Sequence, residues 1–438
     1  MARAAGRAEY LLLGLGALGY TCYTFVWFTL PALLSPVISE FGLSTTQAGV
    51  VVGAVPLVYI PLGLASGLLI DRVGARTAIG IGLVGFGLVQ IARGIAGGFL
   101  TLLVPTLVLG ALGTGITFGL PKLVAELFPP ERTGTMSSVY QVGSSLGSMA
   151  AFGLARPVLE PVFGGWRPIF LATGVVVLGY AAVWIVAVVG YARLGARAAD
   201  GDAEPGAADA AGEGTGSGTP DDRGEAADGD GAAADDRGFT VESARRDLVR
   251  LFSHRDMRLL VVVGTMYLFV NHGLRGWLAV VLEGTGLSPD VAGLITSLLV
   301  GAQIAGTVTI PPLSDRWGRR RGALGGCGLL CAAGTAGLLV GPGALPAVVA
   351  MVALTGLGLG GLSPMIKTLP VEMDGIGPAL TATAVSFVYA VGEIGGFAGP
   401  FVLGALRDAT GGFAVGLAAL VAAGLVIVAA SASMSRVA

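Results

Sequence analysis

The sequence predicts an all-α polytopic membrane protein, in which twelve transmembrane helices form two six-helix bundles related by a parallel repeat. Three observations predict this fold class. Hydrophobic residues make up 54% of the 438 residues and charged residues only 12%, about half the charged fraction of a soluble domain. The apolar residues gather in runs of about 20 residues, the length that a helix needs to cross a bilayer. Short motifs of the first half of the chain recur in the second half.

Twelve apolar runs follow one another with short connections inside each half. They are expected at residues 10–34, 48–70, 78–97, 100–127, 136–159 and 168–191, and again at 259–282, 291–313, 323–340, 345–369, 379–406 and 413–432. Backbone polar groups in lipid must bond within their own segment, so each run is expected to be a helix. Strands of a membrane barrel would be shorter and would alternate. This pattern excludes a soluble enzyme, a single-pass receptor and a disordered scaffold.

An acidic segment rich in Gly and Ala separates the two halves. Between residues 200 and 236 there are 12 acidic side chains and one basic side chain. Such a segment cannot bury enough apolar surface to fold. We therefore expect an N-terminal bundle at 1–194, a disordered acidic linker at 195–238 and a C-terminal bundle at 257–438. Residues 239–256 have the spacing of an amphipathic helix that lies on the membrane surface; the alternative is a solvated helical connection.

The Arg residues predict the orientation in the membrane. If the N-terminus is inside, the inner connections hold most of the Arg residues, and the outer ends hold only Arg93, Arg156, Arg167 and Arg407, with Arg275 nearby. The positive-inside rule then places both termini and the linker in the cytoplasm. We expect a multi-pass protein of the plasma membrane, monomeric, with the lipid bilayer and a small solute as its partners. Outside residues 200–236 the chain has 25 basic and 16 acidic side chains. Lys and Arg gather on the cytoplasmic side of membrane proteins, so this basic excess does not indicate a nucleic-acid partner.

Three motifs recur in the same order in both halves. Gly42-Leu43-Ser44 recurs as Gly286-Leu287-Ser288, and Asp71-Arg72-x-Gly74 recurs as Asp315-Arg316-x-Gly318, both at an offset of 244 residues. Val139-Tyr140 recurs as Val388-Tyr389 at an offset of 249. Each half has six spans, so both halves keep the same orientation, as in carriers whose two bundles rock against each other. Ser44 with Gln47 also predicts a capping box at the start of the second span.

The segment Gly67-Leu-Leu-Ile-Asp71-Arg72-Val-Gly74-Ala-Arg76 lies between the second and third spans and resembles the signature loop of the major facilitator superfamily. A second copy ends in Asp315-Arg316-Trp-Gly318-Arg319-Arg320, with Pro311 where the pattern has Gly. With twelve spans and a long central loop, the resemblance covers the whole chain. It implies a secondary transporter, not an enzyme, whose two loops latch the cytoplasmic face. The implied gate residues are Gly67, Asp71, Arg72, Gly74, Arg76, Asp315, Arg316, Gly318 and Arg319.

Residues 120–134, together with Gly164-Gly165-Trp166-Arg167, resemble the cyanate and nitrate/nitrite porter branches of that superfamily. The Asn- and Gly-rich signatures of the nitrate porters are not evident in the fifth and eleventh spans. The Arg that many drug/proton antiporters have in the fourth span is also missing. The signature loop is therefore specific for the superfamily, and it carries no information about the substrate.

Polar residues within the spans indicate where a solute binds, because such residues are costly in lipid and usually face a cavity. The third, sixth, ninth and twelfth spans are almost free of them and are expected at the periphery. The other spans supply the candidate solute-binding residues: Tyr23, Trp27, Thr117, Lys122, Tyr140, Gln141, Asn271, His272, Arg275, Lys367 and Tyr389. The two lysines are candidates for a cationic vestibule; the alternative is that they are ordinary cytoplasmic anchors.

Glu393 is the sharpest single candidate, because it lies near the middle of the eleventh span. A carboxyl group at that depth can load and release protons, and His272 can shuttle protons near neutral pH. Glu393 and His272 are therefore the candidate proton-coupling residues. The alternatives are an ion pair of Glu393 with Arg275 or a lysine, and a packing role for His272.

The sequence has no nucleotide-binding loop, no metal-ligand motif and no hydrolase motif in a suitable context, so neither a cofactor nor a metal is expected. Its leading function is a secondary active transporter that works by alternating access, is coupled to protons and moves a small organic or inorganic anion. The alternatives are a proton-coupled exporter of amphipathic compounds and, in another class, a carrier-like sensor or membrane assembly factor.

Overall fold

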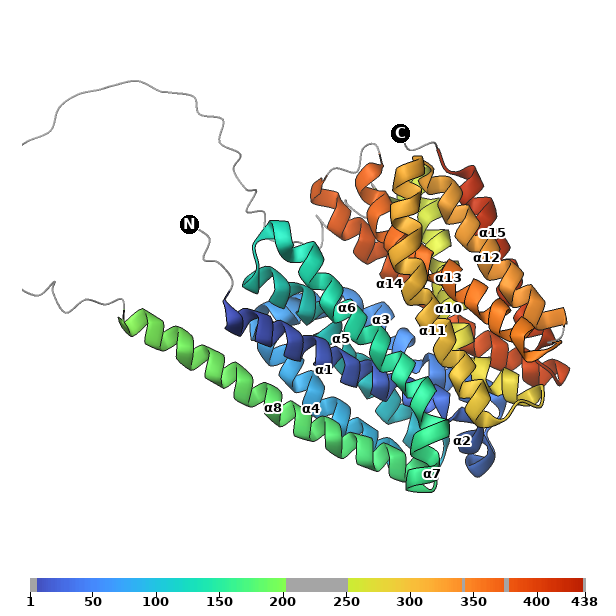
Figure 1. Ribbon diagram of the computed structural model, residues 1–438, viewed down its shortest axis with the longest axis horizontal. Helices are drawn as coiled ribbons and strands as arrows, with labels where there is room; N and C mark the ends of the chain where they lie inside the picture. Colours follow the sequence, from blue (N-terminus) through green and yellow to red (C-terminus); the bar gives the residue numbers. More distant parts are fainter. Residues whose placement is uncertain (1–5, 202–250, 341–342, 374–377, 436–438) are drawn as a thin grey trace, which may run out of the picture.

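The computed structural model describes residues 6–201, 251–340, 343–373 and 378–435, and every regular element in these ranges is a helix (Figure 1). The first half contains α1 (Arg7–Ala32), α2 (Leu34–Phe41), α3 (Thr45–Val73), α4 (Ala75–Gly94), α5 (Phe99–Leu127), α6 (Pro130–Leu154), the π-helical turn η1 (Ala155–Leu159), α7 (Glu160–Phe163) and α8 (Trp166–Gly201). The second half contains α10 (Arg255–Gly284), α11 (Pro289–Trp317), α12 (Arg320–Val340), α13 (Leu345–Thr368), the 3-10 turn η2 (Leu369–Glu372), α14 (Pro378–Thr410) and α15 (Ala414–Ser433).

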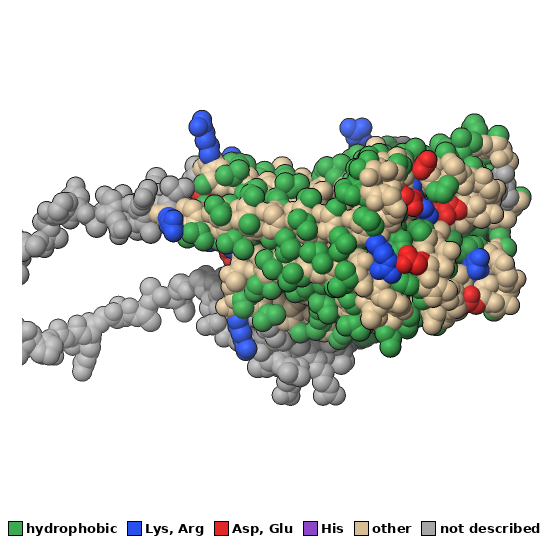
Figure 2. Space-filling model, turned by 90° about the horizontal axis from the view of Figure 1, so that it is seen from below, with side chains coloured by type: hydrophobic (Ala, Val, Ile, Leu, Met, Phe, Trp, Pro, Cys, Tyr) green, Lys and Arg blue, Asp and Glu red, His purple; other side chains and the backbone are tan. Residues whose placement is uncertain are grey.

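Eleven helices in the described part of the chain are long and apolar enough to span a membrane. The twelfth long helix is α6, which carries more polar residues and packs along α1 and α11. On the face shown in Figure 2, hydrophobic side chains cover the middle of the helices, and charged side chains lie toward the ends. The all-helical fold with two bundles of six long helices is thus confirmed.

The two bundles repeat the same packing. Helices α3 and α11 are both 29 residues long and begin at Thr45 and Pro289, which keeps the offset seen in the sequence. In the first bundle α1 packs on α6, α3 on α5, and α4 on α8; in the second, α10 packs on α14, α11 on α13, and α12 on α15. The equivalent pairs show that the sequence repeat is a structural repeat.

Local chemistry sets the repeated helix ends. Ser44 Oγ accepts a hydrogen bond from the Gln47 backbone N–H at 3.1 Å, and Gln47 Oε1 accepts one from the Ser44 N–H at 3.0 Å. This reciprocal pair is the expected capping box at the start of α3. At the other ends of α3 and α11, Gly74 and Gly318 have φ values of 82° and 58°. Only glycine adopts this region without strain, which explains the glycine at the same place in both copies.

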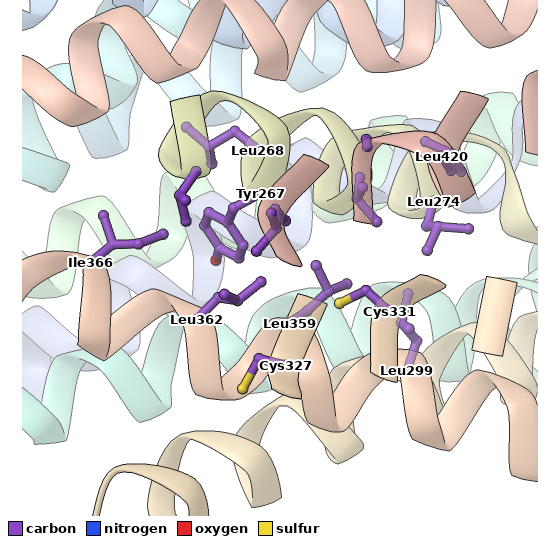
Figure 3. Packing of buried hydrophobic residues seen from close by; sticks show 14 of the residues in the cluster. Tyr267, Leu268, Leu274, Leu299, Cys327, Cys331, Leu359, Leu362, Ile366 and Leu420 are labelled. Carbon is purple, nitrogen blue, oxygen red and sulfur yellow. The ribbon is translucent and has the colours of Figure 1, made fainter. Parts of the chain in front are cut away.

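Most buried apolar residues cluster within one bundle, but the cluster of the second bundle also includes Leu34, Ala48 and Val52 of the first. In the second bundle, Tyr267 and Leu268 of α10 lie near Leu362 of α13, beside the sulfur atoms of α12 (Figure 3). Cys327 and Cys331 are buried there, against glycines of α13 that leave room for the two thiols. Small residues let membrane helices approach closely. These two cysteines therefore serve packing.

The segment between the bundles is described only at its two ends. Helix α8 continues to Gly201, past the start of the linker predicted at 195–238, and the rest of that linker lies outside the described residues. Of the amphipathic helix predicted at 239–256, only the last part is described. There Leu251 is buried in the second bundle, and the ring of Phe252 packs on that of Phe387 with centroids 4.8 Å apart.

The bundles meet at one end of the molecule and diverge toward the other. Figure 1 shows them together at the end that carries α2 and α7, and apart at the end that carries both termini. We call these the α2 end and the terminal end. The contact is formed by α3 with α14 and by α6 with α11. A Cβ added to Gly49 would lie 2.5 Å from the Pro400 carbonyl oxygen, so only glycine allows this close approach.

Candidate functional site

The two bundles bring polar residues together where α1 faces α10. The Trp27 ring of α1 stacks on the His272 ring of α10, with centroids 5.5 Å apart and an angle of 20° between the planes. Trp27 also stacks on Phe28, and His272 is 8% exposed. This stack joins the two bundles and forms the centre of the candidate site.

Glu393 lies beside this stack, on α14. Its Oε2 atom is 3.9 Å from His272 Nε2, and its side chain is 12% exposed. Gly396, one turn further along α14, makes room for both groups, since a Cβ there would lie 2.4 Å from Glu393 Oε2. Among the described residues, no donor bonds to that buried oxygen. A buried carboxylate without a hydrogen bond is costly, so Glu393 is suited to exchanging a proton or binding a solute.

Arg275 joins a polar chain that runs through the second bundle. It donates a hydrogen bond to Gln303 Oε1, and Gln303 Nε2 donates one to Asn271 Oδ1 at 2.9 Å. The guanidinium lies 5.0 Å from the centre of the Phe28 ring of the first bundle. Its Nε atom is buried and has no partner among the described residues. Arg275 therefore offers one unused donor at the interface, and it is not paired with Glu393.

A chain of hydroxyl groups forms the corresponding wall of the first bundle. Tyr23 and Tyr59 share a hydrogen bond of 2.8 Å between their hydroxyl groups, and Tyr59 and Thr117 share one of 3.0 Å. The Tyr20 ring stacks beside Tyr23 and lies 6.1 Å from the ring of Tyr140. Tyr59 is not among the candidates predicted from the sequence, although it is a polar residue within the second span.

Some predicted solute-binding residues lie elsewhere. Gln141 is exposed on α6, whereas its neighbour Tyr140 is buried. Lys122 Nζ lies 2.5 Å from Asp71 Oδ1, so Lys122 pairs with the first signature loop, and its role in a vestibule stays a prediction. Lys367 lies 5.4 Å from the centre of the Tyr389 ring, and the Tyr389 hydroxyl is 3.5 Å from Ser363 Oγ. These two residues form a separate contact nearer the terminal end.

Two matches to one family model cover nearly the whole chain. The model is described as Major Facilitator Superfamily, and it matches residues 16–283 and 259–436. The chain belongs to the Major Facilitator Superfamily. It is therefore a membrane transporter and not an enzyme, and the two overlapping matches follow the structural repeat of its bundles.

Individual relatives in this superfamily are distant. A putative tartrate transporter of Agrobacterium vitis is 24% identical over 89% of this chain and 84% of its own length. A nitrate/nitrite transporter of Picosynechococcus is 28% identical over 33% of this chain and 28% of its own length. A solved structure has a TM-score of 0.73 at 18% identity, covering 98% of this chain and 96% of the other. It is a bacterial homologue of the human lysosomal transporter Spinster, inward-facing and unoccupied, and it shows the same fold.

Both signature loops of the superfamily bond within their own bundle in this conformation. Asp71 pairs with Lys122, and Asp315 Oδ1 lies 2.9 Å from Arg320 Nη2. Arg76 Nη2 lies 3.7 Å from Glu126 Oε2, and Gly67 is exposed. Arg72, Arg316 and Arg319 are exposed as well. Since the bundles diverge at this end, the loops lie apart from the opposite bundle.

Hydrogen bonds between the bundles cluster instead at the α2 end. Asp408 of α14 accepts from the backbone N–H groups of Thr45 and Thr46 at 3.0 and 2.7 Å, and from both threonine hydroxyl groups. A carboxylate is favourable at a helix N-terminus because the first N–H groups have no partner within the helix. Asp408 therefore caps α3 from the other bundle. No motif had pointed to Asp408.

A second cross-bundle contact comes from the π-helical turn η1. Arg156 in this turn lies 2.8 Å from Glu160 Oε2 and 3.3 Å from Glu283 Oε1 of α10. A π-helical turn inserts one extra residue into a helix and often marks a functional position. Here it directs a guanidinium into the interface. Sequence reasoning had treated Arg156 only as an outer charge.

Two further Arg residues near the α2 end have structural partners. Arg93 is fully buried, donates to the Val26 carbonyl at 3.0 Å and lies over the Phe170 ring. Arg167 Nε donates to Glu40 Oε1 at 2.8 Å, and the Trp166 indole donates to the other oxygen. The Arg167 hydrogen bond lowers the pKa of Glu40, which lies in α2. These residues hold the α2 end together.

Proposed function

We propose that this transporter moves a small organic or inorganic anion by alternating access and couples that movement to protons. The solute would bind between the bundles, against Trp27, Tyr23, Tyr140 and Arg275. Glu393 and His272 would exchange the proton. The observation that carries the proposal is the contact of Trp27, His272 and Glu393, because these three residues come from both bundles and meet at their interface.

Arg275 supports an anionic solute. It is a cationic side chain at the interface beside Asn271 and Gln303, and its Nε atom is buried without a partner among the described residues. Arginine binds carboxylate and related anions through paired donors. The similarity to proteins named as tartrate and nitrate/nitrite transporters points to the same class of solute.

Glu393 supports proton coupling. Its side chain is 12% exposed, and among the described residues its ion-pair partner is His272, at 3.9 Å. Such a group is costly to keep charged in apolar surroundings and can take up a proton when the cavity opens to the acidic side. Lys122, Lys367 and Arg275 each have another partner, so none of them holds Glu393 as a fixed anion.

The distribution of Arg residues supports an orientation with both termini in the cytoplasm of a plasma-membrane protein. At the α2 end Arg156 and Arg167 are paired with acidic side chains, whereas Arg72, Arg316 and Arg319 are exposed at the terminal end. The positive-inside rule assigns that end to the cytoplasm. The acidic linker would lie on the same side, and the conformation would be inward-facing.

In this scheme the signature loops act when the cytoplasmic end closes. Asp71 would exchange Lys122 for donors of the opposite bundle, and Asp315 would do the same with Arg320. Gly67 and the turns at Gly74 and Gly318 would allow the close approach. The exposed Arg72, Arg316 and Arg319 would complete this gate together with the half-buried Arg76.

The coupling step is tested in proteoliposomes that contain the full chain. Wild-type protein is expected to accumulate radiolabelled tartrate or nitrate when a pH gradient is imposed. Glu393→Gln should reduce this accumulation to the level seen without a gradient, yet retain exchange of labelled for unlabelled solute. Glu131→Gln, which removes an exposed carboxylate at the start of α6, is the control. Accumulation by Glu393→Gln at the wild-type level would show that coupling lies elsewhere.

The anion class is tested by the solute dependence of Arg275 variants. Arg275→Gln removes a charge-assisted hydrogen bond and should raise the KM for the anion about tenfold or more. Arg275→Lys should recover part of the affinity, since it keeps the charge. Arg407→Gln is the control, because Arg407 lies in the last turn of α14, at the α2 end. Equal KM values for wild type and Arg275→Gln would disprove an anionic solute bound at this residue.

One observation favours a second candidate, the export of amphipathic compounds. The first bundle presents aromatic rings of Tyr20, Tyr23, Trp27 and Tyr59 around one another. Aromatic faces bind large apolar and cationic groups. This candidate predicts that an amphipathic cation competes with transport, that Trp27→Ala abolishes the competition, and that Arg275→Gln leaves it intact.

A further inference from the structure

The second bundle carries a groove away from its interface with the first bundle. It lies between α12 and α15 at the terminal end and has a volume of about 820 Å³. Its mouth is formed by the consecutive arginines Arg319, Arg320 and Arg321. Its floor is formed by small and apolar residues, among them Gly322, Gly326 and Leu329. The groove lies apart from Trp27, His272 and Glu393, and two of its arginines, Arg319 and Arg320, belong to the second signature loop.

A second groove lies on the other face of α12, toward α11. It has a volume of about 500 Å³ and is lined by Ile310, Leu313 and Leu330, among other residues. The two grooves share Arg319, Gly322 and Gly326. Together they form one site, the α12 groove, with two apolar branches that meet below a guanidinium group.

The branches exist because α12 lacks side chains at their junction. A Cβ added to Gly326 would meet no atom within 4 Å, and one added to Gly322 would meet only Arg319 Cβ, at 3.8 Å. Leu329 on the floor is 55% exposed. In a bilayer, an open apolar groove on the outside of a helix is filled by acyl chains, and in this site there is room for two.

Two of the three arginines at the mouth, Arg319 and Arg321, have no acidic partner in the part of the chain that the structure describes. Arg321 Nε donates to the Ser431 carbonyl at 2.8 Å, and Arg321 also donates to the Ala432 carbonyl, which fixes its position without neutralising it. Arg320 pairs with Asp315 at 2.9 Å. Among the described residues, no side chain pairs with Arg319, which is exposed. Arg319 and Arg321 therefore carry charges that no carboxylate among the described residues neutralises.

We propose that the α12 groove binds one anionic phospholipid from the adjoining leaflet. Its phosphate would lie against Arg319 and Arg321, where guanidinium groups can donate paired hydrogen bonds. Its two acyl chains would follow the two faces of α12 from the shared glycines. Basic pockets between membrane helices bind anionic lipid headgroups. A soluble anion would use the arginines but would leave both apolar branches empty.

Native mass spectrometry of the purified full chain, titrated with phosphatidylglycerol or phosphatidylcholine, tests this site. Wild-type protein should bind one phosphatidylglycerol molecule more tightly than phosphatidylcholine. Arg319→Gln should weaken that binding about fivefold, the effect of one basic residue at a lipid surface. Gly326→Leu should weaken it by filling the junction of the branches, and its added side chain starts in open space, so the fold should tolerate it.

Two matched variants separate this site from general effects. Arg255→Gln removes an exposed charge at the start of α10, and Gly179→Leu adds the same bulk to an exposed and open position of α8. Both should bind phosphatidylglycerol like the wild type. The proposal is overturned if Arg255→Gln weakens binding as much as Arg319→Gln, or if phosphatidylcholine binds equally well. Displacement of the lipid by inorganic phosphate would also overturn it, because it would show a site for the free anion.

Discussion

At the scale of single residues, the site is defined by polar atoms that the protein leaves unused. Most buried polar groups in proteins have hydrogen-bond partners, and the tyrosines of the first bundle follow this rule, with Tyr23, Tyr59 and Thr117 bonded in a chain. Glu393 Oε2 and Arg275 Nε, by contrast, are buried without a partner among the described residues. Both lie near Trp27 or Phe28 at the interface of the bundles. One acceptor and one donor are therefore available for a proton and a solute.

Another residue pair makes the α2 end sensitive to acid. Because Arg167 donates to Glu40 and lowers its pKa, the pair stabilises the fold fully above the ordinary pKa of a glutamate. This contribution is lost as the pH falls through the lowered pKa. Glu40→Gln should therefore lower the melting temperature at pH 7 and have progressively less effect in the range below pH 4.5. The effect should be small, about 1 kcal/mol at most, since both side chains are partly exposed.

Thermal unfolding in detergent, followed by intrinsic fluorescence across this pH range, measures the difference. Glu131→Gln removes an exposed carboxylate at the terminal end and should not show the same pH dependence. A difference between wild type and Glu40→Gln that grows on acidification would contradict the assignment.

At the scale of elements, the cap of α3 is shared between distant parts of the chain. Ser44 and Gln47 cap the helix locally, and Asp408 supplies a carboxylate from α14 to the next two N–H groups. The same helix thus begins with both a local and a cross-bundle cap. Because the second cap forms only when the bundles are in contact, it stabilises the conformation that is closed at the α2 end.

Asp408→Asn should weaken this closure, since a neutral amide is a poorer partner for two N–H groups than a carboxylate. The loss of hydrogen bonds to a charged group is about 1.5–3 kcal/mol. A cysteine introduced at Val52, which is 7% exposed and packs against Gly276 of the other bundle, reports the change. Its labelling by a water-soluble maleimide should become about tenfold to a hundredfold faster in Asp408→Asn.

Asp290→Asn is the matched control, because it removes an exposed acidic charge from the first turn of α11 at the same end. The parent protein without the introduced cysteine gives the background from the native thiols. If both aspartate variants label at the rate of the Val52→Cys parent, Asp408 does not hold the bundles together.

The comparison of elements with the sequence also shows what a linear pattern can predict. The helix order, the repeat and the local cap at Ser44 depend on nearby residues, and the structure confirms them. Which face of a helix points inward is harder to predict when its sequence is nearly uniform. Tyr140 and Gln141 are both candidates from the sequence, whereas only Tyr140 is buried.

Pairing across long separations could not be predicted at all. The pair of Lys122 with Asp71 joins two helices across 51 residues, and no local pattern distinguishes it from the two expected roles, a cationic vestibule or a cytoplasmic anchor. The contact between Asp408 and Thr45 spans 363 residues. Such partners depend on how the helices pack and, between bundles, on the conformational state. The polar residues within the spans therefore indicate candidate helices for the site, and the contacts between those helices come only from the structure.

At the scale of the whole molecule, the repeat also governs the interface. Helix α3 packs on α14 and α6 packs on α11, and these two contacts are equivalent under the repeat because α3 corresponds to α11 and α6 to α14. The ionic pairs of both signature loops stay within their bundles, while Asp408 and Arg156 bridge the bundles at the α2 end. Most of each core lies within one bundle, and we expect each bundle to move as a unit that breaks and re-forms the extensive contacts of α3 with α14 and of α6 with α11.

If each bundle moves as a rigid body, opening of the α2 end is accompanied by closing of the terminal end. Gly53→Leu should exclude the present conformation, because even a Cβ at Gly53 would lie 2.9 Å from the Phe397 ring and 3.0 Å from the Phe397 carbonyl oxygen.

Spin labels at Val162 and Leu345 report the α2 end, and labels at Glu131 and Val371 report the terminal end; all four positions are exposed. In Gly53→Leu the first distance should lengthen and the second should shorten, as measured by double electron–electron resonance. Gly190→Leu, at an open position of α8, should leave both distances unchanged. A longer distance at the α2 end without a shorter one at the terminal end would mean that α3 and α14 separate locally and that the bundles do not rock.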